Sequence, residues 1–447
     1  MSSRLPTLTE NRFLRLFSVT ALYMSQGIGM GVVIISLPAV MAAADLEVAQ
    51  ISGFMGVVLI PWALKFFFAP FMDRFTFLSL GRRRPWVIIG ILLPACCYFL
   101  TSLVSNPFDN LMLFLLATTC SFGGTAVMDV AIDGMVVDIM NEKEQAKANG
   151  LMFGGKVFGT AIAAWASGWM FKNQGVSATF LAAGLATLAF GLIPLLLRER
   201  PGEKLFPWSP GQASPESLAI QQESWREIGR NLLKVLLLPG SYVIIGLILL
   251  AGSIQGMFDA LIPVVTVQEL GWESDHYSKT AGIAKLLAGA VGMIAGGWLV
   301  NKLGHKRALS LFLTLLAGTG ISMGILPTYW ENETFTTAQI LLHHACRTLA
   351  LVTCFSIGMA LCWKQIAASQ FALYMAFGNL GISMGSILMG RAANILHYHQ
   401  IFFVLAGLAI LGILIGSSLN LAAHQKRVRA FSQSPSDQLE EKPAGHA

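Results

Sequence analysis

The chain has 447 residues, of which 55% are hydrophobic and only 12% are charged, and its formal net charge is +6. Soluble proteins carry about 25% charged residues, so this composition excludes an ordinary water-soluble globular protein and predicts a membrane protein. The basic residues lie mainly between the apolar runs, so the positive charge does not indicate binding to nucleic acid.

The apolar runs are continuous and about 20 residues long or longer, which is typical of transmembrane helices and not of β-barrel strands. Twelve spans are predicted, at residues 14–41, 50–72, 86–104, 111–140, 148–171, 176–197, 238–262, 280–300, 308–327, 336–360, 367–390 and 401–421. The first run is too long for the core of a signal peptide, so we expect it to be retained as a span.

The longest polar interruption divides the spans into six and six. This predicts an N-terminal bundle (1–197), a plain cytoplasmic linker (198–237), a C-terminal bundle (238–421) and a disordered cytoplasmic tail (422–447). Lysine and arginine gather on one side of the predicted spans, so the positive-inside rule places both termini in the cytoplasm. The six cysteines match no metal motif and are expected to be small apolar residues of the spans.

A short motif recurs in the loops after spans two and eight. The first copy holds Asp73 and Arg74, then Gly81, Arg82, Arg83 and Arg84, and the second holds Asn301, Lys302, Gly304, His305, Lys306 and Arg307. Glycine permits a tight turn, and the bases anchor the loop at the cytoplasmic face and can bind helix C-terminal carbonyls. Two copies in register predict that the two halves repeat one architecture.

With these loops and spans the chain resembles the major facilitator superfamily over roughly residues 12–421. The resemblance implies an all-α membrane protein with twelve transmembrane helices in two six-helix bundles around a central cavity that opens alternately to each side. It also implies that spans one, four, seven and ten line the cavity. The chain departs from the family pattern in the extra residues 75–80 and in Asn301, which stands where the pattern has an acid.

A narrower resemblance is carried by residues 61–66 (Pro-Trp-Ala-Leu-Lys-Phe), 81–86 and 129–134 (Asp-Val-Ala-Ile-Asp-Gly). These segments are similar to the muropeptide-permease (AmpG-like) branch, which also holds siderophore importers of the RhtX/FptX type and acetyl-CoA transporters. The first segment and the compact length favour the siderophore importers.

Two acids lie within span four. Asp129 and Asp133 are one helical turn apart on one face, and burying one carboxylate in a bilayer costs about 2.5–3.5 kcal/mol on insertion scales. Lys65 and Lys156 are expected near the depth of Asp133, roughly 10 Å from the cytoplasmic end. Two compatible interpretations remain. Protonation of the acids couples transport to protons, or the acids form a fixed gate with Lys65, Lys156 or the arginines at 82–84.

The second half has charges of its own within the spans. Asp259 and Lys285 have matching depths near the outer ends of spans seven and eight, which predicts an ion pair, and Gln255 lies one turn before Asp259. Arg347, with His343 one turn away, lies near the middle of span ten. Arg347 is expected to contact an anionic substrate, or else to pair with an acid of another span, and the histidine can titrate or donate hydrogen bonds. The expected substrate-binding residues are Arg347, His343, Asp259, Gln255, Tyr23 and Gln26.

Other residues complete the expected site and its surroundings. Span one adds Tyr23 and Gln26 to the cavity, Asp138 is expected to be solvated at the end of span four, and Trp62 is expected to face lipid or to serve in packing.

The leading hypothesis is a proton-coupled importer of a bulky polar or anionic solute such as a siderophore, in the bacterial inner membrane. The alternatives are a muropeptide permease, an efflux transporter, and, from another class, a non-transporting assembly factor. The sequence has no phosphate-binding glycine-rich loop and no catalytic constellation, so an ATPase or an enzyme is not expected. The expected partners are the solute, protons and the lipid bilayer. No cofactor, metal or nucleic acid is expected, and the protein is expected to be a monomer.

Overall fold

The computed structural model describes residues 7–104, 108, 110–140, 142–215, 218, 225–363 and 367–432, and most of these residues are helical. Within this part, eleven helical stretches are long and apolar enough to cross a membrane. The stretch Lys147–Leu196 has 50 residues and breaks at Gly175, whose φ of 81° suits glycine. About 20 residues suffice for one crossing, so this stretch supplies two. The predicted class, an all-α protein with twelve transmembrane helices, is confirmed.

The first six spans are formed by α1 (Arg12–Gly29), η1 (Met30–Ser36), α2 (Leu37–Ala43), α3 (Val48–Val58), α4 (Ile60–Ala63), α5 (Lys65–Arg74), α6 (Arg84–Ser102), α7 (Leu111–Ile139) and α8 (Glu142–Leu196), with the short η2 (Leu78–Leu80) in the loop before α6. Span two is interrupted at Leu59 and Leu64, on either side of Pro61, which lacks an N–H group and limits the helix before it. Lys65 therefore begins a new helix inside the span.

The second half repeats the pattern after α10 (Trp225–Leu236). Its spans are formed by α11 (Pro239–Val264), η3 (Val265–Glu269), α12 (Ser274–Val291), η4 (Gly292–Gly296), α13 (Gly297–Leu303), α14 (His305–Ile325), α15 (Glu333–Leu361), α16 (Ala367–Ala393) and α17 (Tyr398–Ser417), with η5 (Pro327–Tyr329) in a turn and α18 (Leu421–Ser432) after the last span.

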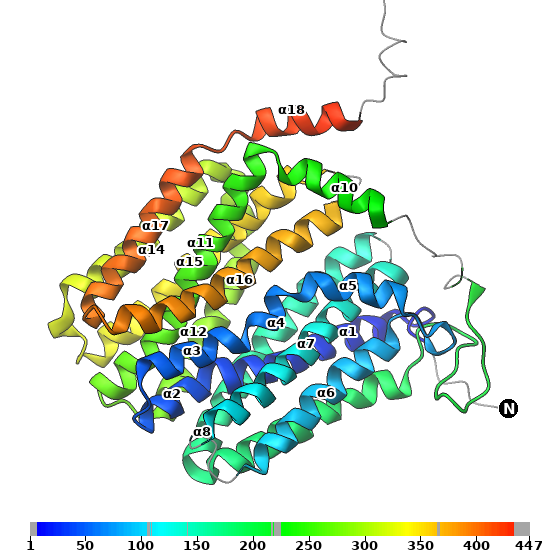
Figure 1. Ribbon diagram of the computed structural model, residues 1–447, viewed down its shortest axis with the longest axis horizontal. Helices are drawn as coiled ribbons and strands as arrows, with labels where there is room; N and C mark the ends of the chain where they lie inside the picture. Colours follow the sequence, from blue (N-terminus) through cyan, green and yellow to red (C-terminus); the bar gives the residue numbers. More distant parts are fainter. Residues whose placement is uncertain are drawn as a thin grey trace, which may run out of the picture.

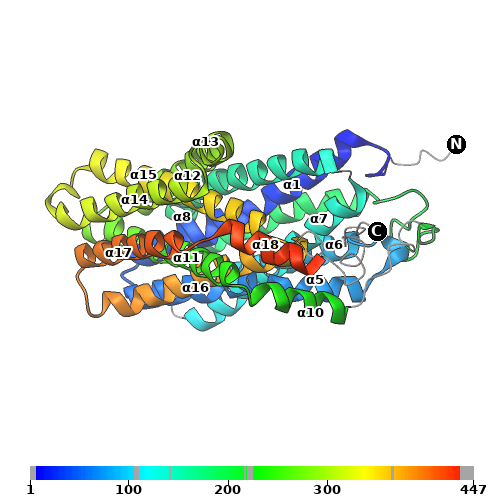
Figure 2. The same cartoon turned by 90° about the horizontal axis from the view of Figure 1, so that it is seen from above.

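The helices pack as two bundles that lie side by side (Figure 1). In the first bundle α1 packs on α8 and α6 on α7, and in the second α11 packs on α16 and α14 on α17. The bundles meet where α8 contacts α12 and where α3 contacts α16. We call the end that holds α5, α10 and α18 the linker end (Figure 2) and the opposite end the far end.

Polar contacts join the two bundles at the far end. Lys172 Nζ lies 2.5 Å from Glu273 Oε2 and 3.7 Å from Asp275 Oδ1. Gln268 Nε2 donates to the carbonyl oxygens of Ala42 and Leu46 at 3.0 and 3.1 Å. These contacts tie the second bundle to the first away from the linker end.

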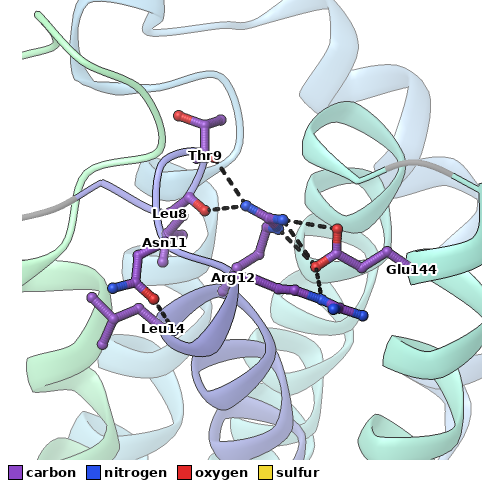
Figure 3. A network of polar contacts seen from close by, with 7 residues as sticks. Leu8, Thr9, Asn11, Arg12, Leu14 and Glu144 are labelled. Atoms are coloured by element: carbon purple, nitrogen blue, oxygen red, sulfur yellow. Dashed lines mark hydrogen bonds and ion pairs between the residues drawn. The ribbon is translucent and has the colours of Figure 1, made fainter.

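Figure 3 shows how α1 is fixed to α8 at the linker end. Asn11 Oδ1 accepts from the backbone N–H of Leu14 and caps α1. Arg15 Nη2 lies 2.8 Å from Glu144 Oε2, and Arg12 Nε lies 3.6 Å from Glu144 Oε1. Glu144 is buried, so this pairing helps to set how α1 and α8 approach each other.

The expectation of a disordered tail from residue 422 is wrong for its first part. Residues 421–432 form α18, because His424 and Gln425 bond to the carbonyl oxygens of Leu361 and Ala360 at the end of α15. Val428 packs beside Trp363 in a small apolar cluster. Residues 433–447 lie outside the described part of the chain.

Candidate functional site

Lys65 and Asp129 form a buried ion pair in the first bundle. Lys65 Nζ lies 3.0 Å from Asp129 Oδ2, and the two side chains are 8% and 4% exposed. The break in span two lets Lys65 point at α7, which carries Asp129. Because each charge neutralises the other, removing either one would leave an uncompensated charge in the membrane.

Asp133 has a different environment from Asp129. Its Oδ1 accepts a short hydrogen bond from the hydroxyl of Tyr23 on α1, and the residue is exposed. Tyr23, which was expected to bind substrate, is bonded to this acid. One carboxylate of the pair is thus enclosed and matched to a lysine, and the other is exposed and bonded to a neutral hydroxyl.

Lys156 lies on an aromatic ring. Its Nζ is 4.0 Å from the centroid of Trp62, and Lys65 Nζ is 5.7 Å from the same ring. Trp62 is buried, so it belongs to the charged cluster and does not face lipid. Sequence reasoning missed this role, although the position of Trp62 three residues before Lys65 was a usable indication.

Two polar side chains next to this cluster have no hydrogen-bond partner among the described residues. Gln26 is buried, and neither atom of its amide group is bonded. It lies one turn beyond Tyr23 on α1. The indole nitrogen of Trp62 is likewise buried and unbonded. We call Tyr23, Gln26, Trp62, Lys65, Asp129, Asp133 and Lys156 the first-bundle cluster.

A second polar cluster lies between α11, α12 and α15. Asp259 Oδ2 lies 3.1 Å from Lys285 Nζ, and Gln255 Nε2 donates to the same oxygen at 3.4 Å. Arg347 Nη1 donates to Gln255 Oε1 at 2.7 Å. We call Gln255, Asp259, Lys285 and Arg347 the second-bundle cluster. The expected pair of Asp259 and Lys285 is present, and Arg347 joins it through an amide.

His343 is turned toward the packing of the second bundle. Its ring stacks on Phe258 with 3.5 Å between centroids, and its Nδ1 lies 3.1 Å from the hydroxyl of Thr319. Both His343 and the neighbouring His344 are buried. These contacts differ from the substrate-facing placement that the sequence suggested for His343.

The first loop motif forms a buried clamp with the start of the expected linker. Glu199 accepts from the backbone N–H groups of Arg82 and Arg83 at 3.0 and 2.7 Å and from that of Arg84 in a shorter bond. These three N–H groups lie at the N-terminus of α6, where a carboxylate is favourable. Gly81 has a φ of 105° and lies against Glu199. The side chains of Asp73 and Arg74 lie outside what the structure describes.

Asp138 is not solvated as expected. Its side chain is 8% exposed, and its carboxylate lies 3.0 Å from Arg83 Nε and 3.7 Å from Arg82 Nη1. Arg83 passes over Gly134, where a Cβ atom would lie 2.8 Å from the guanidinium carbon. The glycine after Asp133 therefore lets the loop reach α7. The loop arginines pair with Asp138, and Asp129 pairs with Lys65.

The segment after α8 also packs on this clamp. Arg84 Nη2 donates to the carbonyl oxygen of Leu205 at 2.7 Å, and Lys204 N donates to that of Ser79 at 2.7 Å. Glu203 is buried, one of its oxygens accepts from Arg200 N at 3.0 Å, and the other has no partner among the described residues. Burial, together with the nearby Glu199, raises the pKa of Glu203 to about 7.

The second loop motif makes fewer contacts. Asn301 and Lys302 are exposed, and Lys302 Nζ lies 5.0 Å from the ring of Trp298. Gly304 has a φ of 79°, so the turn itself is repeated. Across the described residues, no group of three or more His, Cys, Asp or Glu side chains is arranged to hold a metal ion.

These features define a helical transporter with two bundles and polar residues within the spans. Residues 19–370 match the Major Facilitator Superfamily, and the chain belongs to that superfamily. This membership confirms the expectation drawn from the loop motifs.

Named relatives place the chain in the AmpG-like branch of the superfamily. The anhydromuropeptide permease of Escherichia coli (strain K12) is 22% identical over 386 residues, which cover 83% of this chain and 74% of that protein. Putative transporter AmpG 1 of Rickettsia bellii (strain RML369-C) is 22% identical over 349 residues, which cover 76% of this chain and 82% of that protein. The narrower sequence resemblance is therefore confirmed at the level of the branch.

Solved structures agree on the fold. A D-xylose-proton symporter superposes with a TM-score of 0.68 at 13% identity, covering 91% of this chain and 98% of that one. The nucleoside transporter NupG superposes with a TM-score of 0.69 at 12% identity, covering 90% and 98%. At these identities the likeness concerns the arrangement of the helices.

Proposed function

We propose that the protein is a proton-coupled importer of a bulky polar solute of the anhydromuropeptide class. It acts as a transporter and not as an enzyme, in the bacterial inner membrane with both termini in the cytoplasm. The observation that carries the coupling proposal is the unequal environment of the two acids, since Asp129 is enclosed with Lys65 and Asp133 is exposed and bonded to Tyr23.

The unequal environments assign different roles to the acids. Asp129 is neutralised by Lys65, whose Nζ lies 3.0 Å from its Oδ2. Asp133 exchanges protons with solvent while it is exposed, and it loses that contact when the bundles close at the linker end. Protonation also removes the negative charge that favours Lys156 in this cluster. A carboxylate that is hydrated in one state and enclosed in the other can load and release a proton in each cycle.

The solute class is supported by the named relatives and by the unbonded polar groups of the first-bundle cluster. The relative from Escherichia coli is a permease for anhydromuropeptides, and this chain covers most of that protein's length. The unbonded groups of Gln26 and Trp62 are suited to a solute that carries hydroxyl and amide groups.

A second candidate solute is a siderophore. The segment 61–66, which favours this reading in the sequence, supplies both Trp62 and Lys65 to the first-bundle cluster. The segment 61–66 is therefore part of the first-bundle cluster, and that cluster is compatible with either solute.

Uptake by purified protein in proteoliposomes tests both parts of the proposal. Under an inward proton gradient we expect the parent to accumulate radiolabelled anhydromuropeptide and not ferric siderophore. Asp133→Asn should abolish accumulation and keep exchange of solute in the absence of a gradient within about threefold, because the amide still accepts from Tyr23 but cannot be ionised. Accumulation by Asp133→Asn equal to that of the parent would refute the coupling role, and accumulation of siderophore alone would refute the solute class.

A further inference from the structure

The second-bundle cluster contains more positive than negative charge. Asp259 is the one carboxylate in it, and Lys285 already lies 3.1 Å from that carboxylate. Arg347 bonds to the amide oxygen of Gln255 at 2.7 Å and is not within ion-pair distance of any carboxylate among the described residues. The cluster therefore holds two cations and one anion.

The first-bundle cluster is balanced by comparison. It holds two lysines, Lys65 and Lys156, and two acids, Asp129 and Asp133. An extra cation within a span is unfavourable unless an anion approaches it, because the surrounding medium cannot solvate the charge. The excess positive charge in the second-bundle cluster indicates that the anion that neutralises Arg347 comes from outside the protein.

Arg347 has free donors for such an anion. A guanidinium group offers five N–H donors in a planar fork that fits a carboxylate. One Nη1 hydrogen binds Gln255, Nη2 lies 3.5 Å from the hydroxyl of Thr348, and Nε is unbonded within the described part of the protein. The residue is only half-buried, whereas His343 and His344, one turn before it, are buried.

Gln255 holds the cluster in this arrangement. Its amide oxygen accepts from Arg347, and its amide nitrogen donates to Asp259 at 3.4 Å. Asp259 is thereby kept with Lys285, and the guanidinium of Arg347 is oriented without being neutralised. Gln255 is a positioning residue, and it separates the internal acid from Arg347.

We propose that Arg347 binds a carboxylate of the transported solute and that this contact makes the transporter select acidic over neutral forms of one solute. The inference rests on the proposed function, since the peptide part of an anhydromuropeptide carries free carboxylates. A bidentate bond between the solute carboxylate and Arg347 balances the cluster and replaces water at the guanidinium.

The test compares two forms of one solute in proteoliposome counterflow, namely anhydromuropeptide with free carboxylates and the same compound with its carboxylates amidated. The parent should transport the acidic form at least about tenfold better at low concentration, as expected for a charge-assisted pair of hydrogen bonds. Arg347→Gln should remove the preference, so that the acidic and the amidated form are transported at the same rate.

Gln255→Glu provides a test that does not depend on the fold tolerating the loss of Arg347. It places a carboxylate beside the guanidinium and fills the site from within, so the protein should lose the preference for the acidic form although Arg347 is kept. Gln339→Glu makes the same substitution on α15 away from this cluster, and it should keep the preference.

Each outcome bears on one proposal. Equal transport of both forms by the parent, or a preference retained in Arg347→Gln or Gln255→Glu, overturns the role of Arg347 and leaves the proposed function standing. Transport of neither form by the parent overturns the proposed solute class and this inference with it.

Discussion

The two halves of the molecule share an architecture and differ in how they treat charge. In the first bundle, two lysines and two acids are gathered from three spans, and the loop arginines are enclosed by Glu199 and Asp138. In the second bundle, one acid serves Lys285 and Gln255, Arg347 is bonded to an amide, and the corresponding loop residues are exposed. The two bundles therefore share one fold but differ in the arrangement of their charged residues.

This difference suggests that the two bundles have different roles in transport. A balanced cluster that contains one exposed acid is suited to taking up and releasing a proton without a large change in stability. A cluster with an extra cation is suited to an anion supplied by the solute. At the linker end of the first bundle, the loop motif is held in a buried clamp by Glu199 and Asp138. In the second bundle, Asn301 and Lys302 of the corresponding loop are exposed.

The largest expected effect comes from breaking the balance of the first-bundle cluster. Asp129→Asn leaves Lys65 buried without a counter-charge, so we expect a loss of about 3–5 kcal/mol in stability and transport below detection. The double variant Lys65→Gln/Asp129→Asn should recover the melting temperature and not the transport. Melting temperatures in detergent and uptake assays would measure this, and a double variant as unstable as Asp129→Asn would contradict the pairing.

A smaller effect on stability is expected at the clamp of the first bundle, and this effect depends on pH through the buried Glu203. Folding raises the pKa of Glu203 from an ordinary 4.5 to about 7, so the folded protein binds a proton more tightly than the unfolded chain. Its contribution to stability is full below pH about 4.5 and is lost as the pH rises through about 7. Glu203→Gln is neutral at every pH and should exceed the parent by about 1–2 kcal/mol at pH 8 and match it at pH 4.5.

Thermal unfolding of the parent and of Glu203→Gln at both pH values would measure this effect. Glu331→Gln is the matched control, because Glu331 is exposed and should change nothing at either pH. A gain that is the same at both pH values would show that the buried charge of Glu203 is not its cause.

The smallest effect is expected in the second loop copy. Lys302→Gln removes only a contact with the ring of Trp298 and should change stability by less than about 1 kcal/mol. Arg83→Gln, at the enclosed copy, should cost several times more because it leaves Asp138 partly unpaired in a buried setting. Similar losses in the two variants would remove the contrast between the loops.

Several features of the site could be read from the sequence with little help. The positions of Asp133, Lys65 and Lys156 relative to the span ends predicted that these three lie near one depth, with Asp129 one turn deeper, because a helix has a constant rise per residue. The same argument brought Asp259 and Lys285 together. Predictions that depended on direction around the helix fared worse, and His343 and Asp138 both point to unexpected partners.

The sequence by itself determined the membrane class, the twelve spans and the repeat of the two halves, because these follow from local composition. Only the tertiary structure decided which partner each charge has. Lys65 reaches Asp129 through a break in span two, Lys156 rests on Trp62, and Gln255 stands between Arg347 and Asp259. Such pairings depend on how neighbouring helices are rotated and spaced, and that is set by the packing of the whole bundle.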